Sequence, residues 1–307
     1  FLADKRNTSG MAVRLPDEVG VIMPFRYVEV ESCPYPITTD TIRQIAVTYP
    51  FDNDAAAFVS SSPALDRVYQ LCKYSIRMTS FAGVYVDGDR ERIPYEADAY
   101  MNQLGHYATD REYTLARYTI EYLMAHPTWP TEWKQHSIML AWTDWMYTGN
   151  TDSLARCYAD LKGKKLLASW ARESDGLLVS PGPSQEKDGC KDIVDWPDYE
   201  RDGFEFKNVN AVVNAFHALN LRQMADIAAA LGKTDDADAF RKEYARVSEA
   251  FNKVFFNAER GCYVDGEGAA HASVHANMLP LAFGLVPAAE KARVAQFVKW
   301  RGMACSV

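Results

Sequence analysis

Acidic and basic side chains crowd into residues 87–98. This stretch holds five carboxylates and two guanidiniums within twelve residues, after an apolar run and before a segment of helical periodicity. Paired carboxylic acids can move a proton to and from a reacting group, and guanidiniums can hold carboxylates in a fixed geometry. Residues 87–98 are therefore the first candidates for chemistry.

A purely structural interpretation of this stretch is also open. Acids favour the first turn of a helix, so Glu96 and Asp98 could act as caps and nothing more. Pro94 argues for more than capping, because a helix cannot run back through it to Glu91. Glu91 is then expected on a loop and Asp98 about one turn inside the next helix, so that their carboxyl groups can converge on one cavity.

The run Arg90-Glu91-Arg92, with Asp98 six residues further on, resembles the signature of family 78 glycoside hydrolases, the bacterial α-L-rhamnosidases. The resemblance extends from about residue 20 to residue 300. It implies that Glu91 is the general acid. It also implies that Asp87, Arg90 and Asp98 bind the sugar.

Three further residues of the stretch are weaker candidates for the same site. Where the family has Gly-Trp and Gly, this sequence has Pro94-Tyr95 and Ala97, which leaves the exact sugar open. Asp89 competes with Asp87 for the leading Asp of the motif. The weaker candidates are Asp89, Glu96 and Arg92.

The chemistry implied by the resemblance is inverting hydrolysis of a terminal α-L-rhamnose from an oligosaccharide, a polysaccharide or a glycoside. Such an enzyme needs an acid and a base, with the two carboxyl groups about 6.5–9.5 Å apart. In the family the base is a Glu near the end of the toroid, and no suitable segment follows Val286 here. We expect a fragment whose activity alone stays open; the alternative is a substitute base, Glu132, Asp195 or Glu200.

Two loop segments combine tryptophan with acids, as carbohydrate sites do. Trp129 and Glu132 stand at the start of one helical segment, and Asp195-Trp196 lies in a Gly- and Pro-rich insert and resembles the Asp-Trp of the family. The alternative is that these tryptophans are core and the acids are solvated. We favour substrate binding for Trp129, Glu132, Asp195 and Trp196, and the core for Trp142 and Trp145.

No metal or other cofactor is expected. Three histidines are better explained by helix packing than by ligation, and six dispersed cysteines show no zinc spacing; these histidines are His136, His271 and His275. The net charge of −8 argues against nucleic acid, and no apolar run is long enough to span a membrane. A carbohydrate is the expected partner. The oligomeric state is open, and a periplasmic or extracellular location is favoured slightly over the cytoplasm.

The elements that must position these residues are mainly helices. Alternating residues at 21–30 and 42–49 predict strands, and residues 1–55 are interpreted as the end of a β-sandwich domain with a linker. Residues 56–307 are interpreted as an (α/α)6 toroid that lacks its C-terminal part. Helical periodicity begins at Ser60 and continues at 96–109, 111–126, 133–149, 151–173, 208–232, 234–256 and 272–301.

Two other functions stay open at this stage. A toroid of the same kind could cleave another sugar, as an α-L-fucosidase, a glucosidase or a trehalase relative does. A non-catalytic carbohydrate-binding protein or helical scaffold is the second possibility, in which Glu91 and Asp98 only cap a helix.

Overall fold

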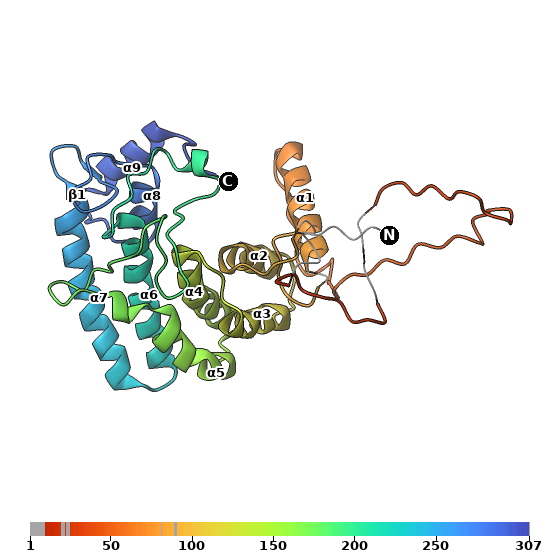
Figure 1. Cartoon of the computed structure of the whole chain (residues 1–307), viewed down its shortest axis with the longest axis horizontal. Coiled ribbons are helices and arrows are strands. Elements are labelled where there is room, and N and C mark those ends of the chain that lie inside the picture. Colours follow the sequence, from red (N-terminus) through yellow and green to blue (C-terminus); the bar gives the residue numbers. More distant parts are fainter. Residues whose placement is uncertain (1–9, 20–21, 23–24, 81, 89–90, 307) are drawn as a thin grey trace. The chain divides into compact units, whose positions relative to one another are not determined.

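The structure is a computed structural model that describes residues 10–19, 22, 25–80, 82–88 and 91–306. The chain divides into two compact units, Phe1–Tyr122 and Leu123–Val307. Helices are the main regular secondary structure in the described part of both units (Figure 1). The boundary falls inside α3 (Thr114–Ala125), and each unit is described by itself below.

The first unit contains α1 (Pro63–Thr79), α2 (Glu96–Thr109) and most of α3. Asp66 fixes the start of α1, because its Oδ1 accepts hydrogen bonds from the backbone N–H and the hydroxyl of Ser60. Helices α1 and α2 approach closely at Gly105. A Cβ there would lie 2.9 Å from Cδ1 of Ile76, so a larger residue would require the Ile76 side chain to shift.

A buried chain of polar side chains stabilises the segment before residues 87–98. The Tyr85 hydroxyl lies 2.6 Å from Nδ1 of His106, and Nε2 of His106 lies 3.3 Å from Oδ2 of Asp110. With Nε2 protonated, the imidazole donates to Asp110 and accepts from Tyr85. The fully buried Tyr85 therefore ties this segment to α2.

The described residues before Pro63 form no β-strand, so the strands predicted at 21–30 and 42–49 are not present as paired strands. An extended segment becomes a strand only when a neighbouring backbone completes its hydrogen bonds. The described residues between 25 and 50 are nearly all exposed and have no such neighbour. Their assignment to the end of a β-sandwich domain stays a prediction.

The second unit is centred on α6. Most residues of α6 (Ala211–Ala230) are buried, and most of them are apolar, as expected for a helix that other elements cover on nearly all sides. It packs beside α7 (Thr234–Phe255), which buries only one face, and against α4 (Thr131–Thr148) (Figure 1). Three residues connect α6 to α7, so the two helices form a hairpin.

Shorter elements complete the second unit. A π-turn follows α5 directly, two 3-10 turns lie in the connection to α6, and a two-stranded antiparallel ribbon follows α7. The bounds are α5 (Asp152–Asp160), η1 (Leu161–Lys165), η2 (Ala168–Trp170), η3 (Asp198–Glu200), β1 (Phe256–Asn257), β2 (Cys262–Tyr263), α8 (His275–Ala282) and α9 (Lys291–Arg301).

The irregular insert predicted after residue 176 is present and joins η2 to α6. Its tip, residues 183–186, is exposed, whereas Gly182 and Cys190 on either side are buried. Just after this tip, Lys187 and Cys190 exchange backbone hydrogen bonds of 2.9 and 3.0 Å, and just before it the Gly182 N–H donates to Oδ2 of Asp192. The insert is therefore anchored on both sides of a free tip.

Helical periodicity located most helices to within a few residues, but two of the predicted helical segments were longer than the helices that the structure contains. The segment predicted at 151–173 leaves the α-helical geometry after Asp160. The segment predicted at 272–301 is two helices, α8 and α9. Gly284 between them has φ +75, and Pro287 follows it, so the first helix cannot continue. No described helix is long and apolar enough to cross a membrane.

We expect the Asn210→Ala change to lower the free energy of unfolding by about 1–2 kcal/mol, measured by urea denaturation. Oδ1 of Asn210 caps α6 by accepting from the Val213 N–H at 2.9 Å, and its amide donates to the buried Asp192. Asn150 is a matched control, because it caps the more exposed start of α5. Equal losses for Asn150→Ala and Asn210→Ala would contradict the special role of the buried cap.

Candidate active site

Asp87 closes the loop that carries Glu91. Its backbone N–H donates to the Ile93 carbonyl at 3.0 Å, and its Oδ1 accepts from the Ile93 N–H at 3.1 Å. The Arg92 N–H donates to the Gly88 carbonyl at 3.1 Å. The ends of the loop at 87 and 93 are thus joined by two hydrogen bonds, as a stable loop requires.

Two candidate carboxyl groups, those of Glu91 and Asp98, follow this loop closure, and Tyr95 contacts the first of them. The Tyr95 hydroxyl donates to Oε2 of Glu91 at 3.0 Å. Asp98 lies in the first turn of α2, as predicted. Burial raises the pKa of Asp98 above its usual value, and the negative charge of Glu91 raises it further.

The other residues of the stretch have more varied positions. Glu96 opens α2 and is fully buried, so it faces the interior rather than a substrate. Arg92 is also buried, has φ +55, and its guanidinium donates to the Ile22 carbonyl. Arg92 therefore has a structural contact besides any with a carboxylate. Asp89 and Arg90 lie outside the described residues.

Trp129 lies in the second unit at the edge of a shallow cavity. Its side chain is 42% exposed, and the cavity of about 320 Å³ is also lined by Glu186, Gly189 and Lys191. Backbone hydrogen bonds fix this segment, because the Lys191 N–H donates to the Trp129 carbonyl at 3.0 Å. An exposed indole beside polar groups is suited to stacking on a sugar ring.

Glu132 has a different position from the one we predicted. Its side chain is 2% exposed, and both carboxylate oxygens accept hydrogen bonds from the backbone amides of Ile193 and Val194. Burial, and then the charge of Asp192, raise the pKa of Glu132 to about 8. A buried carboxyl group that accepts from main-chain donors is poorly placed to bind a sugar, so the assignment of Glu132 as a substrate contact stays a prediction that these contacts do not support.

Asp195 is held by two partners distant in sequence. Its Oδ2 accepts from Nε2 of His275 at 2.7 Å and from the Ser306 N–H at 3.0 Å, and its Oδ1 accepts from the Ser306 hydroxyl. Burial raises the pKa of Asp195, but the hydrogen bonds from His275 and Ser306 outweigh burial and leave it below the usual value. The adjacent Trp196 is 58% exposed, as a stacking residue would be.

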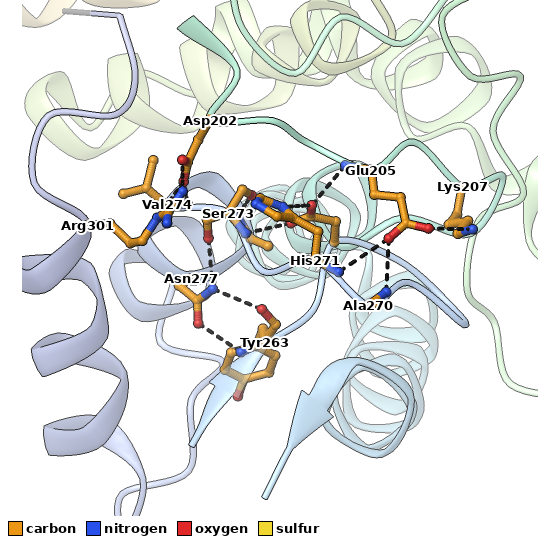
Figure 2. A network of polar contacts seen from close by, with 12 residues as sticks. Asp202, Glu205, Lys207, Tyr263, Ala270, His271, Ser273, Val274, Asn277 and Arg301 are labelled. Carbon is orange, nitrogen blue, oxygen red and sulfur yellow. Dashed lines mark hydrogen bonds and ion pairs between the residues drawn. The ribbon is translucent and has the colours of Figure 1, made fainter. Parts of the chain in front are cut away.

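A second polar network holds the end of the insert against the segment before α8 (Figure 2). The buried Asp265 accepts from Nδ1 of His271 at 2.6 Å and from the amides of Glu205 and Ser273. Asp202 accepts from the Val274 N–H and pairs with Arg301 of α9. Figure 2 shows these contacts meeting in one place, so the part of the chain after Trp196 is fixed.

Sequence analysis missed His275 and Ser306 as partners of Asp195. His271 and His275 are four residues apart, but they contact different carboxylates, Asp265 and Asp195. No spacing links residue 195 to residues 275 or 306, so no local pattern could have indicated these pairs. Among the described residues, no group of three or more potential metal-binding side chains comes together.

Solved structures share this helical fold. A family 78 rhamnosidase of Bacillus sp. GL1 matches with a TM-score of 0.71 and 18% identity, over 84% of this chain and 28% of that one. A Klebsiella oxytoca rhamnosidase with rhamnose bound matches with a TM-score of 0.65 and 12% identity, over 84% and 50%. A Streptomyces avermitilis α-L-rhamnosidase complexed with L-rhamnose matches with a TM-score of 0.58 and 17% identity, over 83% and 24%.

These similarities define the fold class: the chain has the helical architecture of the six-hairpin glycosidases, the α/α toroid. Its family follows from the sequence model of the bacterial alpha-L-rhamnosidase 6 hairpin glycosidase domain, which matches residues 53–306. The chain belongs to that family. It spans half or less of the length of the rhamnosidases compared above. No curated protein matches it significantly.

The raised pKa of Glu132 predicts a pH-dependent stability. Between about pH 4.5 and pH 8 the folded state holds a proton on Glu132 that the unfolded state has lost, so stability falls as the pH rises through this window. Glu132→Gln removes this titration. Its unfolding midpoint, relative to the wild type, should rise by about 3 °C or more from pH 5 to pH 8.5.

Differential scanning calorimetry at several pH values measures this difference. Glu249 is a suitable control, because it is exposed on α7. Midpoints of Glu132→Gln and the wild type that stay parallel across the window would contradict a raised pKa at Glu132.

Proposed function

We propose that this chain supplies the catalytic acid and the sugar-binding surface of an inverting α-L-rhamnosidase. The observation that supports this most directly is the hydrogen bond of 3.0 Å from the Tyr95 hydroxyl to Glu91, beside the partly buried Asp98. This arrangement stands at the positions of the family motif, within the residues that the family model matches. It gives Glu91 a defined orientation on its loop.

In the proposed reaction, Glu91 protonates the glycosidic oxygen as the bond to the anomeric carbon breaks. Asp98 and Asp87 accept hydrogen bonds from sugar hydroxyls, and Arg90 stabilises the carboxylates by its charge. In the second unit, taken by itself, the exposed Trp129 and Trp196 indoles are suited to stacking on the apolar side of a sugar ring, and Asp195 lies beside Trp196. The exposure of both indoles supports this role over a core role.

A second carboxylate must activate water on the opposite face of the sugar. Glu132 is a poor choice, because its oxygens are occupied by the amides of Ile193 and Val194. Asp195 is also a poor choice, since hydrogen bonds lower its pKa and weaken it as a base. Nothing in the structure favours Glu200. We therefore leave the base unassigned within this chain.

The sugar is proposed from the relatives. The Klebsiella oxytoca and Streptomyces avermitilis rhamnosidases are described with rhamnose or L-rhamnose bound, and they share this fold. Related toroids could act on α-L-fucosides or glucosides, so release of nitrophenol from a panel of aryl glycosides is the direct comparison. Turnover of the α-L-rhamnoside alone supports the proposal, and preference for another sugar would replace it.

Glu91→Gln should lower turnover of an alkyl α-L-rhamnoside at least about 100-fold in the natural protein that contains this sequence. The amide keeps the shape and can still accept from Tyr95, but it cannot deliver a proton. The loss should be smaller for 4-nitrophenyl α-L-rhamnoside, because nitrophenolate leaves without protonation. Steady-state kinetics on both substrates measure the difference.

Glu249→Gln is the matched control, since Glu249 is exposed on α7. An equal loss of activity on both substrates would argue against proton transfer by Glu91. Unchanged turnover of Glu91→Gln would remove Glu91 from the mechanism and favour the scaffold alternative.

The stereochemistry of the product tests the inverting mechanism separately. Attack of water from the face opposite the leaving group gives β-L-rhamnose as the first product of an α-L-rhamnoside. Proton NMR during the first minutes of hydrolysis, before mutarotation, distinguishes the anomers. Initial formation of α-L-rhamnose would show a retaining reaction and a covalent intermediate.

A further inference from the structure

Trp196 ends a short loop whose backbone is under unusual constraint. Residues 192–196 lead from the buried Asp192 to the exposed Trp196. Val194 within it has φ +63, in the left-handed region that β-branched residues rarely adopt. Such a conformation persists only where surrounding contacts determine it. The contacts that determine it here come from two buried carboxyl groups, Glu132 and Asp192.

Glu132 holds the middle of the loop from the first turn of α4. Its Oε2 accepts from the Ile193 N–H at 3.0 Å, and its Oε1 accepts from the Val194 N–H at 2.9 Å. Two consecutive amides therefore point to the same carboxyl group. These amides have no strand or helix to complete their hydrogen bonds, so Glu132 takes the place of regular secondary structure.

Asp192 holds the start of the loop at the N-terminus of α6. Its Oδ2 accepts from the Gly182 N–H at 3.1 Å, from the Asn210 amide at 3.0 Å and from the Ser180 hydroxyl. Asn210 is the residue that caps α6. The loop is thus tied to the first turns of α4 and α6, two helices that pack together in the same unit.

Glu132 and Asp192 also influence each other. Burial raises the pKa of each group, and the charge of Asp192 adds to the rise at Glu132. Two adjacent buried carboxylates are costly when both are ionised, so the pair keeps a proton near neutral pH. A neutral Glu132 still accepts from both amides, because each carboxyl oxygen retains a lone pair.

We propose that Glu132 and Asp192 are positioning residues that fix residues 193–196 and so hold the Trp196 indole outward as a stacking surface for the sugar. This inference rests on the proposed function for its sugar, but the fixation of the loop does not depend on it. Asp195 also holds the loop, through its hydrogen bonds with His275 and Ser306. Of the three carboxyl groups, Glu132 is the one whose side chain contacts the backbone of the loop itself.

Hydrogen exchange tests the fixation of the loop. In Glu132→Leu the Ile193 and Val194 amides should exchange at least tenfold faster than in the wild type, while amides inside α6 keep their protection. Glu132→Gln, which keeps one acceptor oxygen, should give a smaller acceleration. Glu249→Leu is the control at an exposed site. Unchanged exchange at residues 193 and 194, or faster exchange throughout α6 in Glu132→Leu and Glu132→Gln alike, would overturn the inference.

Binding of L-rhamnose, measured by calorimetry with the same variants, tests the role in the site. Glu132→Leu should weaken binding at least tenfold, Glu132→Gln should restore most of it, and Trp196→Ala sets the scale of the full loss. Wild-type affinity in Glu132→Leu would overturn the positioning role. Absence of binding in the wild type would count against the proposed function instead, and the exchange result would still decide whether Glu132 fixes the loop.

Discussion

The second unit depends on the burial of the Asp192 carboxylate at the first turn of α6. A carboxylate leaves water only where hydrogen bonds replace its hydration, and Ser180, Gly182 and Asn210 supply these bonds. Because these donors come from both ends of the insert between η2 and α6, one buried group joins the insert to the helix. The candidate sugar-binding residues of this unit are positioned from that point.

The same physical solution recurs through the irregular parts of the chain. Long connections leave backbone amides without strand or helix partners, and carboxylates accept them instead, as at Glu132, Asp265 and Asp202. An acid in a loop of this protein needs its exposure and its partners known before it is assigned to chemistry.

The helices could be predicted from the sequence, whereas the contacts of the acidic side chains could not. Periodicity and caps predicted α2 and α7 to within a residue, because helix formation depends on neighbours a few positions apart. Pro94 correctly predicted that Glu91 lies outside a helix and Asp98 in the first turn of the next one, α2. The main-chain contacts of Glu132 were not predicted, since a carboxyl group that binds sugar hydroxyls and one that binds amides look alike in sequence. The pairing of Asp195 with His275 spans 80 residues and has no local signal.

The insert also has one place that is free of these duties. Residues 183–185 of the exposed tip precede Glu186, which lines the cavity beside Trp129, and hydrogen bonds hold the backbone at Gly182 on one side and at Lys187 and Cys190 on the other. Additional residues placed there would extend into solvent without altering the anchored backbone, at only a small entropic cost of lengthening a surface loop. Natural variation in length, or a grafted epitope or fluorescent label, is most easily accommodated at residues 183–185.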